Sequence, residues 1–257
     1  WGTYLVCEEN WHNYFVNHDA DDLAARVSHN RYGIAGSGMS KLYGWGTVDP
    51  RFDATPQAGQ PHGGFVNEPH RFGWVVEVDP FDPQSTPVKR TAFGRYCREC
   101  SVLSLGDDGR MAFYSGDDTK GEYVYKFVPS GRFVPGADAD NRRLLDEGTL
   151  YVARFDADGS GEWLALVHGE HGLTAENGFP GQAEVLLNAR AAADRAGATP
   201  MDRPEWVAVH PHSREVYVTL TNNDGRGAKQ PLDRANPRPN NLHGQILRWQ
   251  EEGGDPT

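Results

Sequence analysis

Short runs rich in valine, tyrosine, phenylalanine, tryptophan and threonine recur along this chain, and each is closed by glycine, aspartate, asparagine or proline. This pattern is typical of β-strands that are separated by turns. Three pairs of runs predict β-hairpins, at residues 110–128, 148–166 and 206–223. Single strands are expected at residues 3–10, 72–80 and 244–250.

One segment breaks this pattern, because alanine, leucine, arginine and aspartate replace the β-branched residues between 184 and 197. It predicts a short helical insertion that ends at Gly197. Two long polar segments, residues 17–62 and 222–240, are expected to be loops. The recurring unit of strand, polar turn and strand is typical of β-propeller blades, although no strict repeat period accompanies it.

The number of hairpins sets the expected fold. We predict an all-β fold, a partial β-propeller of about three to four blades with a short helical insertion. The chain opens at Trp1 in what reads as the middle of a strand, and it closes soon after another strand. We therefore expect residues 1–257 to be an internal fragment of a single β-propeller catalytic domain, so missing targeting segments carry no information.

Composition and charge narrow the class of partner. Of the 257 residues, 38% are hydrophobic and 24% are charged, and no apolar run approaches membrane-spanning length. The formal net charge of −11 argues against nucleic acid as a bulk partner, because phosphate backbones are bound by basic surfaces. An acidic protein that handles phosphate needs local positive charge from metal ions or arginine. We expect neither nucleic acid nor a membrane as a partner.

The most informative motif, DRPEW at residues 202–206, lies at the start of the last predicted hairpin. The fork of an arginine can hold a phosphate through two parallel N–H donors. A neighbouring carboxylate can hold a metal ion that polarises the same phosphate. Arg203 and Glu205 therefore predict a hydrolytic metalloenzyme.

A second candidate lies at the end of the first expected strand, where Cys7 is followed by Glu8 and Glu9. A thiolate and carboxylates can bind metal ions, and this donor set suits iron better than a closed, sulfur-rich zinc site. The alternative is a buried cysteine beside a solvated acidic turn.

A third candidate is Glu99, which stands between Cys97 and Cys100. Two cysteines at this spacing can form a zinc or redox pair, but the chain has no second such pair, which argues against structural zinc. A local disulfide in an oxidising compartment stays open as an alternative. A carboxylate in a turn between strands, such as Glu99, can bridge metal ions.

Other polar stretches have a structural explanation of equal or greater weight. Asp117 and Asp118 end an expected strand, where adjacent aspartates serve as calcium ligands or as plain turn residues. Residues 156–161 are similar to the start of a calcium-binding loop but lack its closing glutamate, so a hairpin turn is predicted. His210 and His212 are expected to be turn residues rather than metal ligands.

With these residues in hand, the chain resembles the PhoX family of alkaline phosphatases. The resemblance is carried in order by GTYLVCEENWHNYF, FGWVVEVDPFDPQSTPVKRTAFGRY, YSGDDTKGEYVYKFV, GATPMDRPEWVAVHP, VYVTLTNN and NPRPNNLHGQILRW. It implies a six-bladed propeller with an iron (Fe³⁺) and calcium centre in its channel. It also implies hydrolysis of small-molecule phosphate monoesters by an exported, periplasmic or secreted enzyme, for which we expect a monomer.

The resemblance implies roles for individual residues. Cys7 is similar to the iron-ligating cysteine of the family, and Glu99 and Glu205 match two glutamates bound to the metal cluster. Arg203 resembles the arginine that holds the substrate phosphate. The implied mechanism is metal-assisted phosphoryl transfer, in which Arg203 clamps a phosphate oxygen while metal ions neutralise the others.

Asp117 and Asp118 match an acidic pair of the family, for which we expect calcium binding. The chain departs from the family pattern around Glu99, which reads Lys-His-Glu-Gly, whereas residues 97–100 here read Cys-Arg-Glu-Cys. A cysteine in place of glycine adds a side chain beside the expected ligand.

Two other functions are compatible with the sequence. The first is a calcium-dependent propeller hydrolase of another class, which needs neither a thiolate nor iron. The second is a non-catalytic propeller that serves as a binding scaffold. Iron analysis separates the first from a phosphatase, and turnover of a phosphomonoester separates the second.

Overall fold

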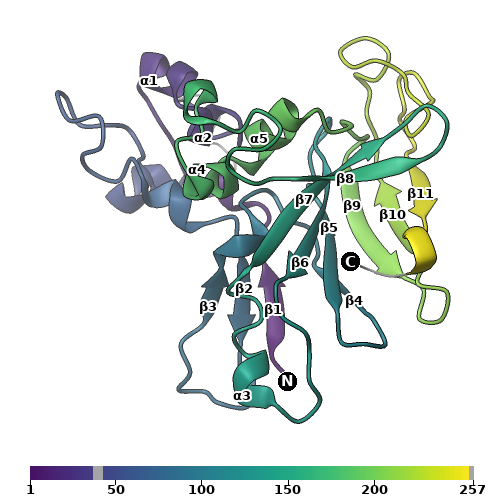
Figure 1. Cartoon of the computed structure of the whole chain (residues 1–257). Coiled ribbons are helices and arrows are strands. Elements are labelled where there is room, and N and C mark those ends of the chain that lie inside the picture. Colours follow the sequence, from purple (N-terminus) through teal and green to yellow (C-terminus); the bar gives the residue numbers. More distant parts are fainter. Residues whose placement is uncertain (37–42, 255–257) are drawn as a thin grey trace.

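Three antiparallel sheets form the framework of this computed structural model, which describes residues 1–36 and 43–254 (Figure 1). The first sheet has the order β1-β2-β3, with strands β1 (Tyr4–Cys7), β2 (Val75–Val78) and β3 (Val88–Arg90). The third sheet has the order β11-β10-β9, with β9 (Pro204–Val209), β10 (Val216–Leu220) and β11 (Gln245–Trp249).

The second sheet has five strands that pair in chain order. They are β4 (Val102–Leu105), β5 (Met111–Gly116), β6 (Val124–Pro129), β7 (Gly148–Phe155) and β8 (Gly161–Ala165). The three predicted hairpins are confirmed as the antiparallel pairs β5–β6, β7–β8 and β9–β10. The turn expected at residues 156–161 joins β7 to β8.

Strand β5 is buried along its whole length because both faces of its sheet are covered. Met111 and Phe113 point into one hydrophobic core, which is also built from residues of the helical region. Ala112 and Tyr114 point into a second core shared with Val207 of β9. A strand that is covered on both faces has no need of polar alternation, which explains its near-continuous apolar sequence.

The α-helices are α1 (Ala20–Ala25), α2 (Val27–Asn30), α3 (Asp138–Asn141), α4 (Gln182–Leu187) and α5 (Ala189–Ala196). Helices α1, α2, α4 and α5 lie together beside the sheets, whereas α3 lies apart from them, near the N-terminus (Figure 1). The 3₁₀ helices are η1 (Trp11–Tyr14), η2 (Trp45–Thr47), η3 (Pro50–Phe52), η4 (Glu68–Arg71), η5 (Thr91–Phe93), η6 (Ala175–Asn177) and η7 (Glu252–Gly254). None of the helices in the described residues is long and apolar enough to cross a membrane.

The two long segments predicted to be loops differ from each other. The described part of residues 17–62 contains α1, α2, η2 and η3, so a plain loop was wrong there. These helices span only three to six residues, which is too short for an apolar periodicity to appear in the sequence. Residues 222–240 contain no helix or strand, as predicted.

The segment after β11 is attached to the second sheet by Glu251. Its carboxylate accepts hydrogen bonds from Tyr114 Oη at 2.7 Å and from Trp163 Nε1 at 3.0 Å. It also lies 3.6 Å from Lys126 Nζ. A single carboxylate thus satisfies polar groups on three strands of the five-stranded sheet.

Two histidines of the helical region, His29 in α2 and His70 in η4, are held in the neutral form. Rings of His29 and His70 lie with their centroids 6.0 Å apart. Nε2 of His29 lies 2.9 Å from the carbonyl of Val66, and Nδ1 lies 3.2 Å from the amide nitrogen of Asn17, so Nε2 carries the proton. Burial, with a smaller contribution from the charge of Arg95, lowers the pKa of His29 to about 4 and that of His70 to about 3.

These two histidines predict a loss of stability in mild acid. Both folded pKa values lie below the ordinary value, so between about pH 6.5 and pH 4 the unfolded chain binds protons that the folded chain does not. The free energy of unfolding should therefore fall as the pH decreases, by about 2 kcal/mol per ring near pH 5. Urea unfolding at several pH values measures this slope.

The matched variants are a His29→Gln/His70→Gln pair and, as a control, His18→Gln at an exposed position. The double variant should flatten the slope, whereas the control should leave it unchanged. An unchanged slope in the double variant would contradict the assignment.

Candidate cation and phosphate site

Three carboxylates from separate parts of the chain meet near the ends of β1 and β5. Glu9, Glu99 and Asp118 each offer one oxygen, and these oxygens lie within 4.8 Å of one another. Glu9 follows β1, Asp118 follows β5, and Glu99 lies on the segment between η5 and β4. Oxygens at this separation can share a bound cation. We call these three residues the acidic cluster.

Backbone hydrogen bonds hold the segment of Glu99 against the end of β5. The N–H of Asp118 donates to the carbonyl of Cys97 at 2.9 Å, and the N–H of Glu99 donates to the carbonyl of Gly116 at 3.3 Å. The two carboxylates therefore lie side by side although β4 and β5 separate them along the chain.

Burial and mutual repulsion raise the pKa values within the acidic cluster. Burial, followed by the charges of Glu99 and Asp118, raises the pKa of Glu9 to about 7. The pKa of Glu99 is also raised, by burial and by the charges of Asp118 and Glu205. A bound cation would relieve this repulsion, so the electrostatics of the site favour one.

Arg203 is joined directly to the acidic cluster. Its Nε and Nη2 donate to the two carboxylate oxygens of Asp118 at 2.6 and 3.0 Å. This bidentate bond raises the pKa of Arg203, so the guanidinium stays charged. The backbone of Arg203 has φ = 64°, a left-handed conformation that costs an L-residue about 1–2 kcal/mol. Such conformations are concentrated at functional sites.

Glu205 and Trp206 complete one side of the site at the start of β9. The Thr221 hydroxyl donates to Glu205 Oε2, which orients that carboxylate. The Glu205 charge acts on both Glu99 and Arg203. Trp206 is 59% exposed, and its side chain acts on the Glu99 carboxylate, whose pKa it lowers against the effect of burial.

The three cysteines of the chain are free, so Cys97 and Cys100 are not joined. Sγ of Cys97 lies 3.4 Å from Nδ1 of His12, whereas Sγ of Cys100 accepts from the backbone N–H of Val207 at 3.3 Å. Cys7 lies near Glu99, and burial raises the pKa of its thiol to about 11. A thiol with this pKa is protonated until a metal ion displaces the proton.

The acidic pair at the end of β5 is divided between two environments. Asp118 belongs to the acidic cluster. Asp117 is completely buried, and its two oxygens accept hydrogen bonds from Arg190 Nε at 2.7 Å and Nη2 at 2.5 Å. This contact gives Asp117 a structural role, and calcium binding by Asp117 stays a prediction.

Sequence reasoning named Glu8 and Glu9 together beside Cys7 but did not distinguish Glu9 as the member of the site. Side chains two apart on an extended segment point to the same face, so Cys7 and Glu9 could have been paired from their spacing. Glu8 points elsewhere. It accepts from the backbone N–H of Gly73 at 2.9 Å and from Lys89 Nζ at 2.7 Å.

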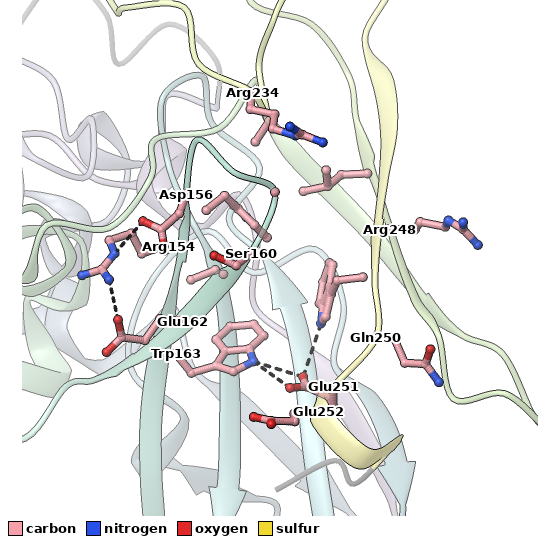
Figure 2. A pocket seen from close by; sticks show the side chains of 17 residues that line it. Arg154, Asp156, Ser160, Glu162, Trp163, Arg234, Arg248, Gln250, Glu251 and Glu252 are labelled. Carbon is pink, nitrogen blue, oxygen red and sulfur yellow. Dashed lines mark hydrogen bonds and ion pairs between the residues drawn. The ribbon is translucent and has the colours of Figure 1, made fainter.

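A separate cavity of about 670 Å³ lies between the β7–β8 hairpin and β11 (Figure 2). Its lining includes Trp163 and Trp249 as well as Arg234. Figure 2 shows Glu251 joined to Trp163 within it. No member of the acidic cluster lines this cavity, so the cavity and the cluster are different places on the molecule.

The fold agrees with what comparison with known proteins finds. The family model of alkaline phosphatase PhoX matches residues 1–257, and the chain belongs to this family, which confirms the resemblance seen in the sequence. A solved structure, Pseudomonas fluorescens PhoX in complex with vanadate, a transition-state analogue, is 49% identical with a TM-score of 0.90. The match covers 99% of this chain and 44% of that chain, so this chain spans less than half the length of its relative. No curated protein matches.

Proposed function

We propose that this chain supplies the cation and phosphate site of an alkaline phosphatase, a metal-dependent enzyme that hydrolyses phosphate monoesters. The observation that carries the proposal is the bidentate contact between Arg203 and Asp118, which joins an anion-binding fork to a cation-binding cluster. Membership of the PhoX family supports it. The vanadate complex of the similar P. fluorescens protein supports it as well.

We propose iron and calcium as the ions of this site. The thiol of Cys7 together with the carboxylates of Glu99 and Glu205 is a donor set that suits Fe³⁺, and the oxygen donors of Glu9 and Asp118 suit calcium. The repulsion that raises the pKa of Glu9 supports this fit, because cations would remove it. When bound, such ions neutralise charge on a phosphate and make an oxygen nucleophile available near neutral pH.

Arg203 would orient the phosphate. Its Nε and Nη2 are held by Asp118, and Nη1 makes no hydrogen bond within the described residues. A phosphate oxygen can therefore accept from Nη1 while Asp118 fixes the plane of the guanidinium. Because the side chain is already ordered, little further entropy is lost when substrate binds. Without a bound cation, the acidic cluster would repel a phosphate, so Glu9, Glu99 and Asp118 would favour the substrate only when they hold one.

We further propose that the chain forms part of a six-bladed β-propeller. The three antiparallel sheets and the match to a longer relative support this arrangement. Small-molecule phosphate esters are the proposed substrates, a monomer is the proposed state, and the periplasm or the cell exterior is the proposed location.

The test is elemental analysis of the full-length protein combined with a phosphatase assay. We expect iron and calcium to co-purify, p-nitrophenyl phosphate to be hydrolysed, and a chelator to remove ions and activity together. Readdition of both ions should restore turnover. A metal-loaded protein that hydrolyses no phosphomonoester would refute the proposal, and an active protein without iron would refute the choice of metal.

A further inference from the structure

The residue before Arg203 is the centre of a buried polar network. Both carboxylate oxygens of Asp202 are used: Oδ1 accepts from Arg226 Nε at 2.6 Å, and Oδ2 accepts from Asn241 Nδ2 at 2.9 Å. Its backbone N–H donates to Asn236 Oδ1 at 3.1 Å. The side chains of Asp202 and Arg226 are both completely buried. We call these four residues the Asp202 network.

The Asp202 network ties the long segment 222–240 to the start of β9. Arg226 Nη2 donates to the carbonyl of Pro200 at 2.7 Å, and Nη1 donates to the carbonyl of Pro231 at 2.9 Å. Asn241 is paired with Asn223 through two backbone hydrogen bonds of 2.6 and 3.0 Å. The guanidinium of Arg226 therefore ties the chain just before Asp202, and the Asp202 carboxylate itself, to the segment 222–240.

A backbone conformation that the sequence disfavours lies directly after this network. Arg203 has φ = 64°, although an L-residue avoids the left-handed region and a residue before proline favours an extended conformation. The carbonyl of Arg203 accepts from the N–H of Thr221 at 2.9 Å, and this bond fixes the peptide group that follows Arg203. A conformation opposed by both local preferences persists only where its surroundings impose it.

This conformation decides where the Arg203 side chain points. Changing φ to a negative value would rotate Cβ about the chain and carry the guanidinium away from Asp118. Buried ion pairs are poor sources of stability, and their best-supported use is to specify one arrangement. Asp202, which forms a buried pair with Arg226, directly precedes Arg203, the residue whose backbone conformation has to be specified.

We propose that Asp202 is a positioning residue: the Asp202 network holds Arg203 in its left-handed conformation and thereby directs its guanidinium into the acidic cluster. The inference rests on the proposed phosphate-binding role of Arg203. It adds Asp202, Arg226 and Asn241 to the residues that determine phosphate affinity, although none of them needs to contact the substrate.

The first test measures phosphate affinity in the full-length protein. Asp202→Asn and the milder Asn241→Ala should each raise the KM for p-nitrophenyl phosphate and the Ki for inorganic phosphate about tenfold, with iron and calcium content unchanged. Arg203→Ala sets the upper limit of the effect. If Asp202→Asn does not fold, Asn241→Ala carries the test, because it removes one hydrogen bond and no charge.

Arg90→Met is the matched control for lost stability. Arg90 forms another buried pair, in which its Nε donates to Glu77 at 2.7 Å in the first sheet. This variant should lower the denaturation midpoint and leave the Ki unchanged. A Ki in the network variants that is as unaffected as in Arg90→Met would overturn the inference. An unchanged Ki in Arg203→Ala would overturn the phosphate role itself.

The second test does not depend on activity. Glycine tolerates positive φ, so Arg203→Gly should unfold at a higher denaturant concentration than Arg203→Ala if the left-handed conformation is imposed. Adding Asn241→Ala should shrink this difference, because the network no longer enforces the conformation. An equal difference in both backgrounds would refute the positioning role, whether or not the protein is a phosphatase.

Discussion

Replacing Arg190 by methionine is expected to lower the free energy of unfolding by about 3–5 kcal/mol, because it leaves a buried carboxylate without its partner. Arg190 and Asp117 have side-chain exposures of 3% and 0%. Burial raises the pKa of Asp117, and the charge of Arg190 is the largest opposing influence. Arg190 also donates to Thr119 at 2.9 Å and to the carbonyl of Arg31 at 3.0 Å. The substitution therefore also removes hydrogen bonds that join α5 to these two segments. Guanidinium chloride unfolding measures the effect.

The double variant Arg190→Met/Asp117→Leu is the control for this prediction. It removes both charges, so it should be more stable than Arg190→Met alone. A single variant that unfolds within about 1 kcal/mol of the wild type would show that Asp117 is neutral in the folded chain. Asp117 is the direct neighbour of Asp118, so this ion pair also anchors one member of the acidic cluster.

Replacing Glu99 by glutamine is expected to remove bound metal and most of the activity of the full-length protein. The amide keeps the shape of the side chain but loses the negative charge that a cation requires. A decrease in kcat/KM of about a hundredfold or more, equivalent to about 2.7 kcal/mol, follows if the ions carry the charge stabilisation. Elemental analysis and turnover of p-nitrophenyl phosphate should fall together.

Glu8→Gln is the matched control for Glu99→Gln. Glu8 is also a carboxylate near the end of β1, but it binds Lys89 and the backbone of Gly73 outside the acidic cluster. Metal content and activity should be unaffected by its replacement. A Glu99→Gln protein that retains both ions and full turnover would exclude Glu99 as a ligand.

Much of the strand framework followed from local chemistry. The runs that became β5 and β6 are apolar, β-branched or aromatic, and the residues between them are polar and turn-forming. The same reasoning predicted β7–β8 and β9–β10. The short helices α1 and α2 were missed, because segments of four to six residues are stabilised by packing rather than by their own sequence.

The chemical types in the site were also visible in the sequence. An arginine beside a glutamate at residues 203–205 predicted phosphate and metal chemistry, and the structure places Arg203 on an acidic cluster. What local sequence did not reveal was which of two adjacent carboxylates enters that cluster. Glu9 enters it and Glu8 does not, and Asp118 enters it while Asp117 pairs with an arginine.

The sequence by itself determined most of the strands, their turns and the kinds of donor available, because these depend on neighbouring residues; β3 and β4 were not predicted. The tertiary structure alone decided which donors meet. Adjacent side chains on an extended chain leave on opposite faces, so the outcome depends on which face the packing of β1, β5 and β9 turns toward the site. The left-handed Arg203 has the same origin, since no local preference favours it and distant residues hold it in place.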